Sequence, residues 1–204
     1  MSHLSRYTAA EAAFVLREPV RAVRKALDAG PVRPFLLQRA GAAVRAIDWR
    51  DLLYLYAVRA LREELTPKAR MDLYEAVRQT PIDRDGEVRF GRLRVSVADL
   101  VDEVDRRTAD LAALADRVDF RSDGEPLLKG TAIEVYRIAA LLAAGMAVDD
   151  VALDYPSLSP DAIKTARSYA QAYPKAGRPY PGTTVKRALR GAGLDALDEA
   201  FGGG

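Results

Sequence analysis

A series of short apolar helical segments, broken at defined points between residues 133 and 170, constrains the fold more than any other feature. Apolar residues recur at helical spacing up to Gly145, which is expected to end the first helix. A second, shorter helix is predicted to end before the Tyr-Pro pair at 155–156. Residues 159–161 (Ser-Pro-Asp) then combine an N-cap, a first-turn proline and a first-turn acid, so they begin a third helix. The pattern predicts a compact three-helix domain over residues 120–173.

The composition supports a helical protein without a catalytic centre. Leucine and alanine are abundant in its 204 residues, there is no cysteine, and the only histidine is His3. Disulfides and thiolate metal sites are therefore excluded, and a Ser-His-Asp triad or a histidine metal site is not expected. Without a P-loop or dinucleotide fingerprint, we expect no catalytic residues, no metal and no cofactor. The longest apolar stretch, residues 138–148, is too short to span a bilayer, and no signal peptide is evident, so we expect a cytoplasmic protein with no membrane partner.

The first thirty residues predict two helices joined by a tight turn. Thr8 is a suitable N-cap for a helix that ends at Leu16. Pro19 is tolerated in the first turn of a second helix, and Gly30 ends that helix.

The second of these helices carries a basic face. Arg21, Arg24 and Lys25 recur at helical spacing, away from the apolar Val23 and Leu27. Residues 1–50 as a whole carry nine Arg or Lys against four Asp or Glu. Two short helices with cations on the second match the geometry of docking into the DNA major groove. The alternative is an αα-hairpin with a solvated basic face.

A β-hairpin is expected next, because apolar runs at 35–38 and 43–47 flank Arg39 and a short turn. Such a wing would place Arg39 beside phosphate. Asp48 is then predicted to cap a helix from Trp49 to about Leu65. The candidate DNA-contacting residues are Arg17, Arg21, Arg24, Lys25 and Arg39.

This N-terminal segment resembles the winged helix-turn-helix of MerR-like and excisionase-like regulators. The resemblance lies in the Thr-x-x-Glu-Ala-Ala opening at Thr8, in Leu16, in the Val-Arg-Lys run ending at Lys25, and in the Arg-x-x-Asp-x-x-Asp-Leu that begins at Arg45. The sequence departs at residues 17–18, where Arg-Glu stands in place of the usual glycine and apolar residue. The resemblance implies binding to promoter DNA.

Residues 66–119 predict a connector of helices and a β-hairpin. A helix is expected from Thr66-Pro67 to about Gln79, and strands at 87–90 and 93–96 flank Gly91-Arg92. A long helix should follow Ser96 and end near residue 119. Its apolar stripe could face the rest of the protein or a second copy, and we expect a homodimer formed through residues 97–172.

An ordered set of motifs runs through the predicted three-helix domain. These are Lys-Gly-Thr at 129–131, Ile-x-Val at 133–135, Ala-Gly-Met at 144–146 and Asp-Tyr-Pro-x-Leu-Ser-Pro-Asp-Ala-Ile at 154–163. Residues 124–172 therefore resemble the helical domain of VapB-type antitoxins, with departures at Ala132, where the family often has Arg, and at Glu134, where it often has Pro. The resemblance implies dimerisation or partner contact, and a PIN-like ribonuclease toxin as the partner. The alternative is a helical dimer module in a regulator without a toxin.

Residues 174–204 predict a flexible, basic tail. Prolines and glycines forbid continuous secondary structure, while apolar residues at helical spacing could order on a partner surface. Its cations match the sign of the carboxylate cluster in a PIN active site. The alternative is a tail packed on its own protein. The candidate toxin-binding residues are Arg178, Val185, Lys186, Arg187, Leu189, Arg190, Leu194, Leu197 and Phe201.

These features predict a mostly α protein in four parts. They are a winged helix-turn-helix DNA-binding domain (1–65), a helical and β-hairpin connector (66–119), a helical antitoxin or dimerisation domain (120–173) and a toxin-binding tail (174–204). The predicted function is that of a type II antitoxin, which neutralises a PIN-like ribonuclease and represses its own promoter. The alternative is a MerR-like transcriptional regulator without a toxin partner.

Overall fold

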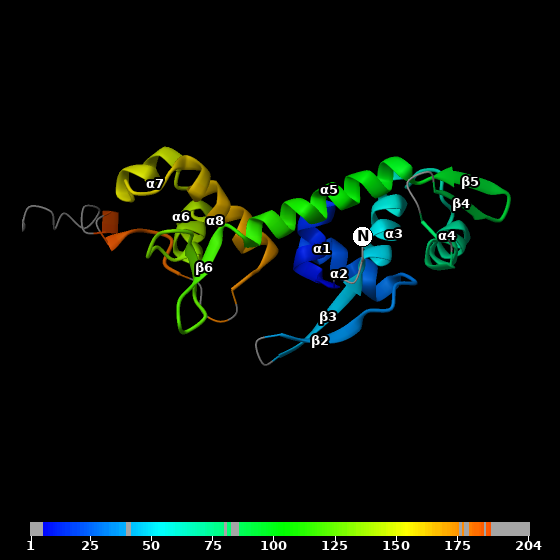
Figure 1. Ribbon diagram of the computed structural model, residues 1–204, viewed down its shortest axis with the longest axis horizontal. Helices are drawn as coiled ribbons and strands as arrows, with labels where there is room; N and C mark the ends of the chain where they lie inside the picture. The colour runs from blue at the N-terminus through cyan, green and yellow to red at the C-terminus, as the bar shows by residue number, and fades with distance from the viewer. Residues whose placement is uncertain are drawn as a thin grey trace, which may run out of the picture. The chain divides into compact units, whose positions relative to one another are not determined.

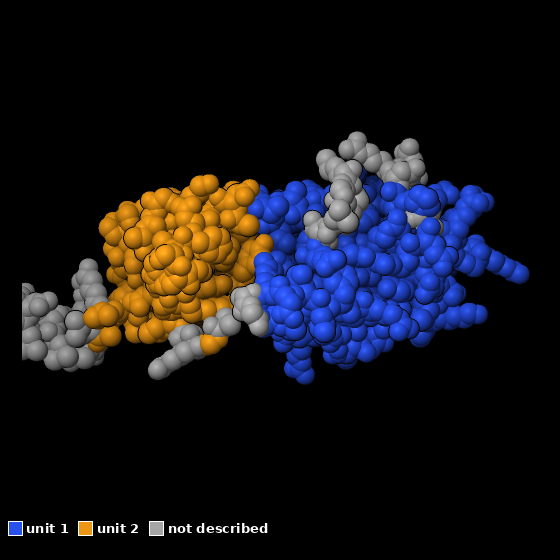
Figure 2. All heavy atoms as spheres, turned by 60° about the horizontal axis from the view of Figure 1, so that its bottom comes forward, with its two compact units in different colours: residues 1–113 blue, residues 114–204 orange. Residues whose placement is uncertain are grey.

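The computed structural model describes residues 6–39, 42–79, 81–82, 86–175, 177, 180–185 and 187–188. Over these residues the chain is mostly α, with eight helices and three small antiparallel sheets (Figure 1). It divides into two compact units, Met1–Ala113 and Leu114–Gly204, which are coloured separately in Figure 2. The division into four parts is finer than this and stays a prediction.

The N-terminal part of unit 1 places two helices against a three-stranded sheet. Its elements are β1 (Arg6–Thr8), α1 (Ala9–Leu16), α2 (Val20–Ala29), β2 (Phe35–Arg39) and β3 (Ala42–Asp48). Both helices and the β2–β3 hairpin were predicted and are confirmed. Strand β1 was missed, because three residues are too few to show an alternating pattern. It pairs with β3, with Tyr7 opposite Ile47, so β3 is central in the order β1-β3-β2.

Two further helices, α3 (Trp49–Ala60) and α4 (Pro67–Gln79), follow β3. The prediction that the first runs to about Leu65 is wrong by five residues. The chain turns at Leu61, whose carbonyl accepts from the amides of Glu64 and Leu65. Leu65 is buried, and Thr66 caps α4 by accepting from the Ala69 amide at 3.2 Å. Burial of Leu65 and the new cap together favour ending α3 early.

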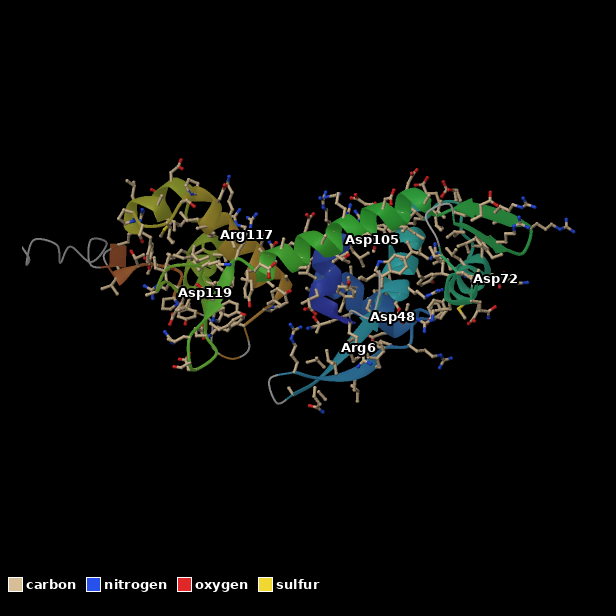
Figure 3. All side chains as sticks on the ribbon, in the orientation of Figure 1. Arg6, Asp48, Asp72, Asp105, Arg117 and Asp119 are labelled. Carbon is tan, nitrogen blue, oxygen red and sulfur yellow. The ribbon has the colours of Figure 1, made fainter. Side chains whose placement is uncertain are left out.

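Unit 1 continues with β4 (Glu87–Phe90) and β5 (Leu93–Ser96), as predicted, and with α5 (Ala98–Ala115). Helix α5 lies along α1 and α3 (Figure 1). Arg107 donates to the Val15 carbonyl at 3.0 Å, and the Trp49 indole donates to Asp105, labelled in Figure 3, at 2.7 Å. Val104 is fully buried within the single chain, so the middle of the predicted apolar stripe is covered by the protein itself.

Unit 2 contains a hairpin and three helices. Its elements are β6 (Val118–Phe120), β7 (Pro126–Leu128), α6 (Val135–Ala143), α7 (Val148–Asp154) and α8 (Pro160–Ala172). The three helices lie where the sequence predicts them, and Ser159 caps α8. The hairpin was missed, and the predicted end of the preceding helix near residue 119 is wrong. Val118 pairs with Leu128 and is buried, so strand pairing stops α5 at Ala115.

Candidate functional site

Helix α1 begins with a reciprocal capping box. The Glu11 amide donates to Thr8 Oγ1 at 3.3 Å, and the Thr8 amide donates to Glu11 Oε2 at 2.7 Å. Ala12, Val15 and Leu16 are buried. The box satisfies two amides that would otherwise lack partners at the helix start, which defines where α1 begins.

A left-handed residue makes the turn between α1 and α2. Arg17 has φ +54°, the Glu18 amide donates to the Ala13 carbonyl at 3.0 Å, and the Arg17 amide donates to the Phe14 carbonyl at 3.2 Å. This is the Schellman arrangement that glycine normally serves. Arg59 of α3 donates to the Leu16 carbonyl and pairs with Glu18 at 2.9 Å. The departure from glycine thus leaves the turn geometry intact, at the cost of a strained arginine.

Helix α2 separates an apolar face from a cationic one. Val23 and Leu27 are buried, whereas Arg21, Arg24 and Lys25 are exposed. Within the described residues, no carboxylate lies within ion-pair distance of these three cations. The sequence pattern predicts the cationic face, and the structure adds that its charge has no counter-ion among the described residues.

An aspartate also lies on this exposed side, and the adjoining hairpin neutralises it. Asp28 pairs with Arg45 of β3 at 2.6 Å, and Arg45 also donates to the Leu27 carbonyl at 3.5 Å. Arg45 thereby compensates the one acidic side chain beside the three cations and ties β3 to the end of α2.

Arg39, predicted to contact phosphate, has an internal partner. It is the last residue of β2, opposite Ala42, and its Nη1 lies 2.8 Å from Glu11 Oε1. The Glu11 side chain is only 7% exposed, while Arg39 is 47% exposed. Glu11 already compensates part of the charge of this guanidinium, so a phosphate would share Arg39 with Glu11. Arg39 thus contributes less free charge than the three cations of α2.

A buried carboxylate lies where β3 meets α3. Asp48 (Figure 3) and Asp51 form a capping box, Arg78 of α4 pairs with Asp48, and the Tyr74 hydroxyl donates to Asp51 at 3.3 Å. Burial, and then the charge of Asp48, raises the pKa of Asp51. The partners of Asp51 are Asp48, Tyr74 and Arg78, so this cluster joins the start of α3 to α4.

The described part of the tail is attached to unit 2. Arg187 Nε lies 2.8 Å from Asp154 Oδ2 at the end of α7, and the Thr184 hydroxyl donates to the same oxygen at 3.1 Å. Arg187 also pairs with Asp150 at 3.3 Å, whereas Val185 is 68% exposed. Seven of the predicted toxin-binding residues lie outside the described residues: Arg178, Lys186, Leu189, Arg190, Leu194, Leu197 and Phe201.

A network around Glu125 was not anticipated from the sequence. Lys175 pairs with Glu125 at 2.6 Å and lies about 5 Å from the ring centroids of Tyr136 and Tyr180. Tyr180 donates to Glu125 at 3.2 Å, so the chain beyond α8 returns to the β6–β7 turn. The hydrogen bond from Tyr180, followed by that from Arg121, lowers the pKa of Glu134. No local pattern could have revealed this network, because Lys175 and Glu125 are 50 positions apart in the sequence.

Two searches of the described residues gave negative results. No helix there is long and apolar enough to cross a membrane. Nor do three or more of the carboxylates and histidines in that part of the chain gather in a way that could hold a metal ion.

Comparison with known proteins gives a family match within unit 2 and one curated relative. Residues 121–170 match the family described as "Protein of unknown function (DUF433)". A stretch of 75 residues is 40% identical to "Uncharacterized protein y4eO" of Sinorhizobium fredii (strain NBRC 101917 / NGR234), covering 35% of this chain, and the chain spans about a third (34%) of that relative. No solved structure matches the chain. Unit 2 thus contains a segment, residues 121–170, that is similar to the DUF433 family.

Proposed function

We propose that this protein is a DNA-binding antitoxin of a type II pair, which represses its own promoter and neutralises a PIN-like ribonuclease. The observation that carries the DNA-binding part is the face of α2. Arg21, Arg24 and Lys25 are exposed there without a carboxylate partner among the described residues, while Asp28 is held by Arg45. A helix that buries one side and offers three free cations on the other suits the major groove.

The flanking elements support the same proposal. The short turn at Arg17 fixes α2 against α1, as the first helix of a helix-turn-helix fixes the second, and the β2–β3 hairpin would act as the wing. Arg45 joins that hairpin to α2, so both would meet DNA as one body. We therefore favour a winged helix-turn-helix for the N-terminal part of unit 1.

Replacing Arg21, Arg24 and Lys25 together by Gln tests the DNA-binding part. We expect affinity for the upstream DNA of its own gene to fall by roughly a hundredfold or more, and the salt dependence to flatten by about three counterions. Fluorescence anisotropy across a salt series measures both quantities. Arg106 is the control site, because Glu103 and Asp110 already hold it, at 2.7 and 3.1 Å. Wild-type affinity in the triple variant would rule out α2 as the DNA-binding helix.

The antitoxin part is supported by the ordered motifs of residues 124–172. Its test is growth of cells that express the neighbouring toxin together with full-length protein or with a chain ending at Tyr173. We expect the shortened chain to fold and bind DNA but to lose protection. Full protection by the shortened chain would exclude the tail as the neutralising element.

A MerR-like regulator without a toxin is the second candidate, and one observation favours it. Thr184 and Arg187 attach the described part of the tail to Asp154 of the same chain, as expected of a tail that packs on its own protein. Absence of a toxin gene next to this gene would favour the regulator.

A further inference from the structure

Hairpin β4–β5 of unit 1 separates an apolar side from a basic one. Val88 and Phe90 are buried, and β4 packs against α4. Arg89 lies between these two residues in sequence and is exposed, so it points to the opposite side of the strand. The hairpin is therefore anchored through its inner face and presents its outer face to solvent.

The hairpin carries three exposed arginines that the protein leaves almost uncompensated. Arg89 lies directly opposite Arg94 in the strand register, and Arg92 occupies the turn. Glu87 is the nearest carboxylate to Arg89, at 3.9 Å, and both side chains are more than half exposed. Among the described residues, no carboxylate comes within 4 Å of Arg92 or Arg94. Like charges directly opposite each other on two strands are destabilising, so this arrangement costs stability unless an anion covers it.

The arginines of α5, in the same unit, are arranged in the opposite way. Arg106 and Arg107 both lie 2.7 Å from Glu103, and Arg106 also reaches Asp110. Unit 1 thus contains arginines that carboxylates hold closely and, on hairpin β4–β5, one arginine with a single carboxylate at 3.9 Å and two without a carboxylate within 4 Å among the described residues.

The backbone of the hairpin holds these side chains in a defined arrangement. Gly91 has φ +58° at the first central position of the two-residue turn, where the type II′ geometry favours glycine. A hairpin that presents several exposed guanidinium groups can contact several phosphates, because a guanidinium forms paired hydrogen bonds with phosphate oxygens.

We propose that hairpin β4–β5 is a second contact element for the phosphate backbone of duplex DNA, separate from α2 and from the β2–β3 wing. The proposal rests on the DNA binding proposed above. Phosphate contacts position a protein without reading its sequence. The hairpin should therefore strengthen binding to specific and unrelated duplexes by the same factor.

The test replaces Arg89, Arg92 and Arg94 by Gln and measures anisotropy with the upstream duplex and with a scrambled duplex. We expect both affinities to fall by about tenfold or more at ~100 mM salt, and the log–log salt slope to flatten by about two to three. The control replaces Arg106, Arg117 and Arg167 by Gln, which removes the same formal charge from other exposed positions. Its slope should stay within error of the wild type. Circular dichroism and melting show whether each variant is folded.

Three outcomes would overturn the proposal, and they are distinguishable. If the hairpin variant keeps wild-type affinity and salt slope while the α2 variant loses binding, the hairpin does not contact DNA, and the DNA binding proposed for α2 stands. If the wild type binds neither duplex, the proposed DNA binding fails, and the hairpin proposal with it. If the hairpin variant binds DNA normally but no longer protects cells from the toxin, the basic face is a docking surface for an acidic protein.

Discussion

Helix α2 and the tail beyond α8 were both selected in part for their basic residues, yet these cations have different partners in the structure. Arg21, Arg24 and Lys25 have no ion-pair partner among the described residues, whereas Arg187 is bound by Asp154 and Asp150 of its own unit. Spacing places cations on one face, but only the neighbouring elements decide whether a carboxylate reaches them. A cation without an ion-pair partner is available to bind a polyanion, whereas a paired cation would first have to leave its carboxylate.

The largest expected effect compares one cation from each region. Arg24→Gln should weaken binding to the upstream duplex by about tenfold or more, since it removes an uncompensated charge from the helix proposed to contact DNA. Arg187→Gln should leave this affinity unchanged, because its charge is already compensated. Anisotropy titrations of the two variants under identical salt measure the contrast. Equal losses in both would mean that the paired arginine also reaches DNA, and the contrast between the regions would disappear.

A second variant weakens the ion pairing of Arg187 without changing the sequence of the tail. Asp154→Asn should weaken the attachment of Arg187 to α7, since a neutral amide oxygen replaces the charged acceptor while Asp150 remains. We expect trypsin to cleave at Arg187 several times faster, as followed by mass spectrometry, and DNA affinity to stay the same.

The same variant separates two roles of the tail. If Arg187 serves a toxin, release from Asp154 should preserve or strengthen protection of cells that express it. Lost protection in Asp154→Asn would show that the attached conformation is the active one. An unchanged cleavage rate would mean that other contacts hold this segment.

A smaller effect concerns the turn that positions α2. Arg17→Gly should raise the free energy of unfolding by about 0.5–1 kcal/mol, because glycine adopts positive φ without steric cost while losing more chain entropy on folding. Urea denaturation measures it, with Arg17→Ala as the control that keeps a side chain in the left-handed conformation. A gain in the alanine variant as large as in the glycine variant would contradict strain at residue 17.

The smallest expected effect is a pH dependence in the scaffold behind α2. The raised pKa of Asp51 means that the folded state binds a proton more tightly than the unfolded state. The contribution of Asp51 to stability is therefore fully present below about pH 4 and is lost as the pH rises through its folded pKa. Urea denaturation of wild type and Asp51→Asn between pH 4 and 7 measures this difference. If the free energy of unfolding of the wild type, relative to Asp51→Asn, increased with pH, the predicted direction of the pH dependence would be wrong.

Local signals in the sequence predicted much of the secondary structure. Thr8, Asp48 and Ser159 are caps whose effect depends on amides three residues away, so α1, α3 and α8 begin where expected. Gly91 likewise indicates a two-residue turn whatever surrounds it. The missed strands β1 and β6 are three residues long, too short to show a pattern of their own, and each exists because another strand, β3 or β7, pairs with it. The sequence placed Val118 at the end of a helix, whereas in the structure it lies in a strand opposite Leu128.

The sequence by itself determined a mostly α chain, the first residues of its capped helices and a cationic face on α2, because each depends on residues within one or two turns of one another. Tertiary structure alone decided which charges remain free. The pairs Glu11–Arg39, Asp28–Arg45 and Asp154–Arg187 join residues 17 to 33 positions apart. A carboxylate cancels a cation only when the fold brings them within a few ångströms, and no periodicity along the chain encodes that distance.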